Sequence, residues 1–195
     1  MIYSPMNKKL AVGSHDNKIY VYNVGIKKYV LHCKFSGHSS YITALDWSMD
    51  ETTIRSCCGA YELLFWDVDA KKQNTSGASA TTGTEWANHK VKFGWRVTGI
   101  FPPGTDGTHV NVVEESKDHK LLATGDDYGL VNIYRNPCRE FKNPKSKNGK
   151  TSMPQARSYR GHSEHVTKIR FHGMGETMIS TGGQDKTVIQ WKRKD

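Results

Sequence analysis

His162, Ser163 and Asp185 are the residue types that a hydrolase combines as base, nucleophile and orienting acid. The first two are adjacent, however, and adjacent side chains of an extended chain point to opposite faces, whereas a triad needs them to converge. The same histidine and aspartate also fit a structural network of imidazole, hydroxyl, carboxylate and indole groups. The members of that network would be His162, Thr181, Asp185 and Trp191. We therefore expect structural hydrogen bonds here rather than a catalytic centre.

Three further patterns resemble ligand sites but lack essential parts. His162 and His165 are two imidazoles at a metal-site spacing, but no other cluster supplies the third or fourth ligand that zinc needs. The stretch from Gly182 to Thr187 lacks the Walker spacing and a following helix. The stretch from Gly104 to Val110 lacks the ligand density of a calcium loop. We expect no metal, no cofactor and no catalytic residue.

The cysteines favour reduced thiols over disulfides or zinc ligands. Cys33, Cys57, Cys58 and Cys138 are irregularly spaced and form no CxxC pair. The adjacent Cys57 and Cys58 would point to opposite faces of a strand, so a bond between them is disfavoured. The sequence shows no signal peptide and no apolar stretch of membrane-spanning length, so we expect a soluble intracellular protein without membrane contacts.

Histidine and tryptophan recur at a nearly fixed distance. His38 and Trp66 are 28 residues apart, and His162 and Trp191 are 29 apart. In both copies a glycine precedes the histidine, and alternating apolar strands and turns fill the interval, which is typical of a WD-repeat β-propeller blade. In the first copy Ala60 occupies the position where an aspartate is expected, six residues before the tryptophan. We therefore expect an incomplete network in that blade.

The aromatic residues that end the third strand of each blade set the blade number. Tyr22, Trp66, Tyr134 and Trp191 are separated by 44, 68 and 57 residues. Because a propeller repeat runs about 40–45 residues, the second and third intervals contain insertions. No segment has a sustained helical period. We predict an all-β chain that forms about four blades of a larger, seven-bladed WD-repeat propeller.

We expect four segments along this partial propeller. They are an incomplete blade at residues 1–24, a blade at 25–68, a divergent blade with an insertion at 69–135, and a blade at 136–195 preceded by a basic loop. Four blades leave unpaired strand edges. The missing blades are therefore expected from the same chain or a neighbouring one.

The net charge of +9 favours acidic partners. Residues 139–158 contain six basic residues and one acidic residue, a local excess of +5, and read as a loop. The candidate partner-binding residues there are Lys142, Lys145, Lys147 and Lys150. The only aromatic residue in this stretch is Phe141, so base stacking would be poor and we do not expect nucleic-acid binding.

The third blade does not begin with Gly-His and carries motifs of its own. They are Glu85-Trp86-Ala87, Gly99-Ile100-Phe101-Pro102, Asp106-Gly107-Thr108, Ala123-Thr124-Gly125-Asp126-Asp127 and Pro137-Cys138. With the flanking blades, this combination closely resembles the echinoderm microtubule-associated protein-like family over nearly all 195 residues. Ala60 and the basic insertion depart from the family pattern and suggest a divergent member.

The resemblance implies two fused propellers, of which this chain would be the carboxy-terminal part of the second. It implies a non-enzymatic scaffold that binds tubulin and microtubules in the cytoplasm and cytoskeleton, at spindles or ciliary axonemes. It carries over no catalytic residue.

An alternative remains open at this point. A general WD-repeat adaptor would dock peptide motifs in a signalling or ubiquitin-ligase assembly. Its contacts would lie on the narrow face of the propeller, near Tyr41, His165 and Lys168.

Overall fold

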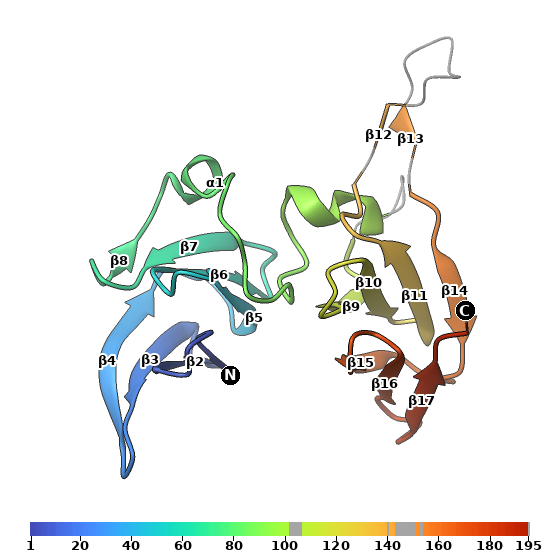
Figure 1. Ribbon diagram of the computed structural model, residues 1–195, viewed down its shortest axis with the longest axis horizontal. Coiled ribbons are helices and arrows are strands. Elements are labelled where there is room, and N and C mark those ends of the chain that lie inside the picture. The colour runs from blue at the N-terminus through green and yellow to red at the C-terminus, as the bar shows by residue number, and fades with distance from the viewer. Residues whose placement is uncertain (102–106, 140, 143–150, 153, 195) are drawn as a thin grey trace. The chain divides into compact units, whose positions relative to one another are not determined.

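The computed structural model describes residues 1–101, 107–139, 141–142, 151–152 and 154–194. Most elements are strands, and they form antiparallel sheets in two compact units, Met1–Val91 and Lys92–Asp195 (Figure 1). The prediction of an all-β partial propeller is confirmed. None of the helices among the described residues has the length and apolar character needed to cross a bilayer.

The first unit contains two four-stranded sheets whose strands follow one another in chain order. The strands of the first sheet are β1 (Ile2–Tyr3), β2 (Lys9–Gly13), β3 (Lys18–Val24) and β4 (Tyr29–Ser36). Those of the second sheet are β5 (Ile42–Trp47), β6 (Thr53–Cys58), β7 (Leu63–Asp67) and β8 (Lys72–Gln73), followed by the short helix α1 (Gly77–Ala80).

The second unit begins with a 3₁₀ helix, η1 (Trp95–Ile100). Its four-stranded sheet consists of β9 (Val110–Glu115), β10 (Leu121–Asp126), β11 (Leu130–Arg135) and β14 (Arg157–Arg160). A small hairpin is formed by β12 (Phe141–Lys142) and β13 (Thr151–Ser152). Among the described residues the last sheet has three strands, β15 (Val166–His172), β16 (Thr177–Gly182) and β17 (Val188–Lys192).

Strand β3 illustrates how the sequence specifies these sheets. Ile19 and Val21 are completely buried, whereas Tyr20 and Tyr22 between and after them are partly exposed. This alternation follows from the two-residue period of a strand. Asn17 in the preceding turn adopts a positive φ of 66°, a conformation that asparagine tolerates better than most residues. The turn and the alternating pattern together fix the register.

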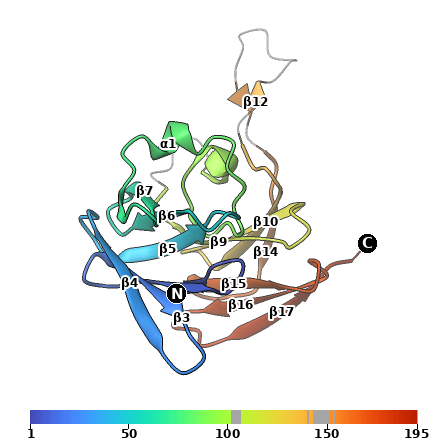
Figure 2. The same ribbon diagram turned by 60° about the vertical axis from the view of Figure 1, so that its left-hand side comes forward.

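Neighbouring sheets inside each unit meet at a glycine. A Cβ atom added to Gly13 at the end of β2 would lie 2.5 Å from Cγ2 of Ile42, the first residue of β5. In the second unit, a Cβ atom at Gly125 in β10 would lie 2.5 Å from Cγ1 of Val166, the first residue of β15. Figures 1 and 2 both show β15 beside the sheet that contains β9 and β10. The absence of a side chain at these glycines allows the adjacent blades to pack closely.

Buried apolar side chains fill the space between the paired sheets. In the first unit one cluster joins Ala11 and Ile19 of the first sheet to Trp47 and Ile54 of the second. In the second unit one cluster joins the two sheets through residues such as Val131 and Ile169. A separate cluster packs η1 against the β9–β14 sheet.

The sheets are offset by one strand from the segments that the sequence predicted. Strand β4 lies in segment 25–68 but pairs with β3 of the first sheet. Similarly, β8 pairs with β7, and β14 pairs with β11. The third-strand aromatics marked the sequence repeat, but the chain then turns back and adds a fourth strand to the sheet it has just built. The fourth strand of each of these three sheets therefore lies in the segment that the sequence analysis assigned to the following blade.

Candidate functional site

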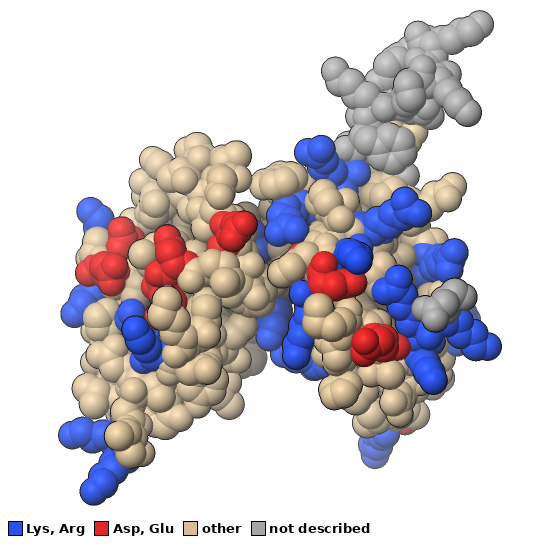
Figure 3. All heavy atoms as spheres, in the orientation of Figure 1, with Lys and Arg blue, Asp and Glu red and all other residues tan. Residues whose placement is uncertain are grey.

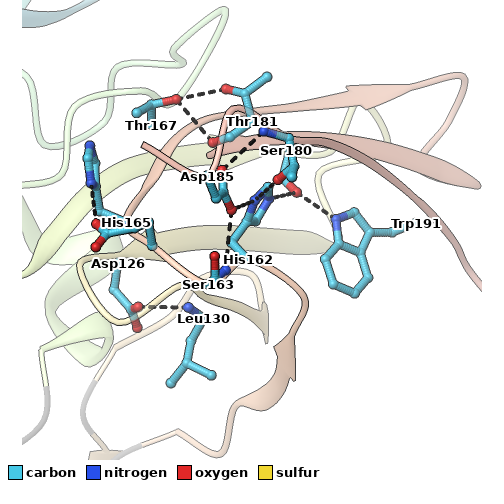
Figure 4. A network of polar contacts seen from close by, with 12 residues as sticks. Asp126, Leu130, His162, Ser163, His165, Thr167, Ser180, Thr181, Asp185 and Trp191 are labelled. Atoms are coloured by element: carbon cyan, nitrogen blue, oxygen red, sulfur yellow. Dashed lines mark hydrogen bonds and ion pairs between the residues drawn. The ribbon is translucent and has the colours of Figure 1, made fainter. Parts of the chain in front are cut away.

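His162 lies at the centre of a hydrogen-bond network in the second unit (Figure 4). Its Nε2 atom lies 2.7 Å from the hydroxyl oxygen of Ser180, and its Nδ1 atom lies 3.0 Å from Oδ2 of Asp185 and 2.8 Å from Oγ1 of Thr187. The indole N–H of Trp191 donates to the same serine hydroxyl at 2.7 Å. Because the histidine and the serine are buried, these mutual bonds replace the water that the polar groups lose on folding.

The hydroxyl in this network belongs to Ser180, so the prediction of Thr181 at that position was wrong. Met178 pairs with Trp191 across β16 and β17, and the strand alternation then directs Ser180 toward the indole and Thr181 to the other face. Oγ1 of Thr181 lies 2.8 Å from Oγ1 of Thr167 instead. Two neighbouring hydroxyl residues fit the sequence spacing, and only the register of the hairpin decides between them.

The hydrolase alternative uses the same histidine in a geometry that the fold does not support. Ser163 donates its backbone N–H to Oδ2 of Asp185 at 3.2 Å. Both ring nitrogens of His162 face members of the structural network. His165, the other imidazole of the possible metal pair, has its Nδ1 atom 3.3 Å from Glu164. The two histidines therefore have separate partners.

The second sheet contains an equivalent network with a different acid. Nε2 of His38 lies 2.6 Å from the hydroxyl of Ser56, to which the indole of Trp66 donates at 2.7 Å. Nδ1 of His38 lies 3.2 Å from Oε2 of Glu62. The expectation that Ala60 leaves this network incomplete was wrong, because the longer glutamate two residues later reaches the histidine.

Hydrogen bonds also determine the ionisation of this glutamate. The hydroxyl and the backbone N–H of Ser39 donate to Glu62, and with the thiol of Cys58 they lower the pKa of its carboxyl group to about 2. Burial lowers the pKa of His38 below its ordinary value, although the neighbouring carboxylate opposes this effect. At neutral pH the pair is therefore an ionised carboxylate beside a neutral imidazole.

A buried ion pair in the first unit was not predicted from the sequence. Asp46 and Arg55 face each other across β5 and β6, and Nη2 of the arginine lies 2.8 Å from Oδ2 of the aspartate. Both side chains are almost inaccessible to solvent. Burial raises the pKa of Asp46, although Arg55 and the backbone N–H groups of Lys90 and Val91 act in the opposite direction. The only signal in the sequence is a charged residue in each of two strongly apolar strands.

This ion pair anchors the segment that carries the Glu85-Trp86-Ala87 motif. The guanidinium carbon of Arg55 lies 4.2 Å from the ring centroid of Trp86, and its Nη2 atom lies 2.7 Å from Nδ1 of His89. The side chain of Asn88 donates to Oδ1 of Asp46 at 2.7 Å. These contacts hold the segment that carries the motif against the second sheet of the first unit.

The predicted adaptor contacts are divided between the two units. Tyr41 is 43% exposed in the first unit, and its ring stacks on that of His15 with centroids 4.7 Å apart. In the second unit the ring of His165 covers Gly183, and Lys168 is exposed on β15. These residues are accessible within their own units.

The predicted basic loop is partly strand. The hairpin of β12 and β13 and the start of β14 at Arg157 fall within residues 139–158. Strand β14 pairs with β11 and presents the exposed side chains of Arg157 and Arg160. Lys142 lies in β12, whereas Lys145, Lys147 and Lys150 lie outside the described residues. The outer strand was missed because its alternating polar residues lack an apolar face.

The family comparison decides what kind of propeller this is. A family model described as "Echinoderm microtubule-associated protein second beta-propeller" matches residues 1–193. This chain belongs to the echinoderm microtubule-associated protein family. The resemblance seen in the sequence motifs is thereby confirmed.

Curated relatives of the family match almost the whole chain. The ciliary WD repeat-containing protein ctxp80 of Euplotoides octocarinatus is 48% identical over 194 residues, which cover 100% of this chain and 25% of the relative. Echinoderm microtubule-associated protein-like 1 of Homo sapiens is 42% identical over 98% of this chain and 22% of its own length. The 77 kDa echinoderm microtubule-associated protein of Strongylocentrotus purpuratus is 44% identical over 97% of this chain and 26% of its own length. The chain therefore spans about a quarter of these relatives of the echinoderm microtubule-associated protein family.

A solved structure supports the fold independently. The Cps50 (Swd1) β-propeller domain of Myceliophteria thermophila matches with a TM-score of 0.62 over 100% of this chain and 66% of that one. The sequence identity is 15%, so this likeness shows the propeller fold alone.

Proposed function

We propose that this chain is the tubulin-binding part of a non-enzymatic cytoskeletal scaffold. Its membership of the echinoderm microtubule-associated protein family is the observation that carries the proposal. The names of those relatives associate them with microtubules, and the name of the Euplotoides relative places that protein in cilia. On this basis we expect the chain on microtubules of the cytoplasm, and the ciliary axoneme is favoured over the spindle.

The distribution of charge supports an acidic partner for the second unit. The first unit contains 10 Lys and Arg residues and 8 Asp and Glu residues, a net charge of +2. The second unit contains 18 Lys and Arg residues and 11 Asp and Glu residues, a net charge of +7. On the face drawn in Figure 3, basic side chains are spread over the second unit. Tubulin carries acidic carboxy-terminal tails, which such a surface attracts.

The outer strand of the β9–β14 sheet offers the best-defined contact surface. Arg157 and Arg160 on β14 and Arg135 at the end of β11 are all exposed. Arginine side chains form two parallel hydrogen bonds with carboxylates, which adds geometry to the electrostatic attraction. We propose that this arginine edge and the lysines of residues 142–150 bind the acidic tails together.

Co-sedimentation of the full chain with microtubules tests the proposal. We expect binding that weakens as salt rises, because the Debye length shortens from about 10 Å at 0.1 M to about 3 Å at 1 M. Microtubules stripped of their acidic tails should retain much less of the chain. Salt-independent binding, or equal binding to stripped microtubules, would contradict the electrostatic mechanism.

Charge-reversal variants separate the two basic surfaces. One variant changes Arg135, Arg157 and Arg160 to Glu, and another changes Lys142, Lys145, Lys147 and Lys150 to Glu. The matched control changes Lys8, Lys27 and Lys28, exposed lysines of the first unit, to Glu. We expect both test variants to bind more weakly than the control. A loss in the control as large as in the arginine variant would show that only net charge matters.

The adaptor function remains a second candidate because Tyr41 is exposed and stacks on His15. Exposed aromatic rings are enriched at protein interfaces and are suited to peptide docking. Affinity capture from cell extract with the wild-type chain and with Tyr41→Ala distinguishes the two candidates. Partners that are lost with Tyr41→Ala and that do not include tubulin would support the adaptor. Capture of tubulin by both proteins supports the microtubule scaffold.

A further inference from the structure

Three side chains with different metal-binding groups converge in the second sheet. Oε2 of Glu62 lies 3.2 Å from Nδ1 of His38 and 3.2 Å from Sγ of Cys58. The three ligand atoms all lie within 4.8 Å of one another. His38 and Cys58 are buried, whereas the side chain of Glu62 is 34% exposed. We propose that this cluster binds one Zn²⁺ ion through the imidazole, the thiolate and the carboxylate.

The separations agree with the dimensions of a zinc site. Zinc binds sulfur at about 2.3 Å and nitrogen or oxygen at about 2.0–2.2 Å, so tetrahedral ligand atoms lie about 3.3–3.6 Å apart. Both measured separations from the Glu62 oxygen are close to that range. Imidazole, thiolate and carboxylate are the ligand types that zinc takes in proteins. The thiol and the imidazole lie within 4.8 Å of each other, so the three groups can close around one ion by small side-chain movements.

Supporting hydrogen bonds for two of the ligands are already in place. Nε2 of His38 lies 2.6 Å from the hydroxyl of Ser56, which Trp66 also contacts. The hydroxyl of Ser39 donates to Oε1 of Glu62 at 2.6 Å, and the backbone N–H of Ser39 donates to Oε2 at 2.9 Å, the oxygen that also faces the other two ligands. Such second contacts orient ligands and strengthen metal sites.

Comparison with the last sheet shows that the ligand set is particular to the second. Cys58 pairs with Ile42, and the corresponding partner of Val166 is Gly182. The side chain of Asp185 occupies the space that a side chain at Gly182 would need. The thiol of Cys58 in the second sheet thus takes the place that the carboxylate of Asp185 takes in the last sheet. Glu62 supplies the carboxylate of the second sheet and completes the three-ligand cluster. The last sheet satisfies its histidine with oxygen atoms alone.

The protons are accounted for when the ion enters. Cys58 releases its thiol proton to solvent. In the metal-free network the neutral imidazole of His38 donates from Nδ1 to the Glu62 carboxylate and accepts the hydroxyl hydrogen of Ser56 at Nε2. When the ion enters, the Nδ1 hydrogen leaves to solvent and Nε2 takes one up and donates it to the Ser56 oxygen, so that Nδ1 can bind the metal. Glu62 binds as the carboxylate that already accepts hydrogen bonds from Ser39. The three protein ligands leave a fourth position, which the exposure of Glu62 opens to water.

Metal titration of the full wild-type chain tests the proposal directly. After treatment with a chelator, the chain is titrated with Zn²⁺ alone and, separately, with Co²⁺ as a spectroscopic probe. We expect one equivalent of Zn²⁺ per chain, a rise in Tm, and a thiolate-to-cobalt charge-transfer band. Failure of the folded wild-type chain to bind Zn²⁺ stoichiometrically at micromolar concentrations would overturn the proposal, and this result does not depend on any variant.

The adjacent cysteines supply a matched pair of variants. Cys57 lies next to Cys58 but contacts Thr43 on the other face of β6. We expect Cys58→Ser to abolish the charge-transfer band and to lower the Zn²⁺ affinity by more than the roughly 10- to 100-fold that loss of a supporting contact costs. Cys57→Ser should leave both unchanged. A charge-transfer band that persists in Cys58→Ser, or that disappears in Cys57→Ser, would overturn the proposal.

Discussion

The indole N–H of Trp66 donates to the hydroxyl of Ser56 at 2.7 Å, and the same bond at the same length joins Trp191 to Ser180. Each serine hydroxyl also contacts a buried histidine. One hydroxyl in each of these two sheets therefore connects the third strand, the second strand and the preceding loop.

Loss of that hydroxyl should be costly in a buried site. We expect Ser180→Ala to lower the free energy of unfolding by about 1–3 kcal/mol, because it leaves the indole and the imidazole without their shared partner. Thr181→Ala removes the neighbouring, less buried hydroxyl and should cost less. Chemical denaturation of both variants measures the difference. A larger effect for Thr181 would contradict the network as described.

Close packing at Gly13 predicts a coupled pair of substitutions. Gly13→Ala places a methyl group against Ile42 and should cost about 1–3 kcal/mol through overpacking. In the Ile42→Ala background the same change should cost less, because the nearest clashing atom, Cγ2, is gone and only Cβ, at 2.8 Å, remains close. A double-mutant cycle measures the coupling. Additive effects would show that the sheets separate freely at this point.

The buried ion pair predicts a large effect from a small change. Asp46→Asn keeps the shape of the side chain but leaves Arg55 as an uncompensated buried charge, at a cost of about 3–5 kcal/mol. Asp69→Asn, at an exposed position, is the control and should change stability by less than about 0.5 kcal/mol. Thermal unfolding of the two variants compares them. Similar melting temperatures would mean that the pair contributes little.

The turn between β5 and β6 predicts a dependence of stability on acid pH. Hydrogen bonds from Ser48 and Thr52 lower the pKa of Asp50 below its ordinary value of 3.8. The folded state therefore favours the ionised form of Asp50 more strongly than the unfolded state does. The resulting stabilisation is present above pH 3.8 and is lost as the pH falls through the lower pKa of the folded state. In Asp50→Asn this part of the acid dependence should disappear when unfolding is followed from pH 5 to pH 2.

The sequence predicted the strands of the repeats well because their apolar residues alternate. For example, Tyr22 was expected at the end of a third strand and lies in β3 (Lys18–Val24), where Ile19 and Val21 are buried in alternation. Repeat spacing also located His162 and Trp191 in one network. Spacing could not choose between Ser180 and Thr181, because that choice depends on the pairing of β16 with β17.

Other features depended on contacts that local patterns do not encode. Glu62 replaces the expected aspartate because its longer side chain reaches His38 from a different position in the turn. Strand β14 has four exposed residues and thus lacks the apolar alternation that marks a strand. Its pairing with β11 is specified by the neighbouring strand.

The fourth strands have a consequence for how such a chain can change in length. Strand β4 follows the third-strand aromatic Tyr22 in the chain but is the edge strand of the first sheet. If the chain is divided between Tyr22 and Tyr29, the first sheet loses β4, and β4 stays with the segment that forms the second sheet. A duplicated or deleted stretch of gene therefore preserves intact sheets only when its ends fall between Ser36 and Ile42. We expect exon boundaries and tolerated insertions to cluster in that short interval and at its counterpart before β15.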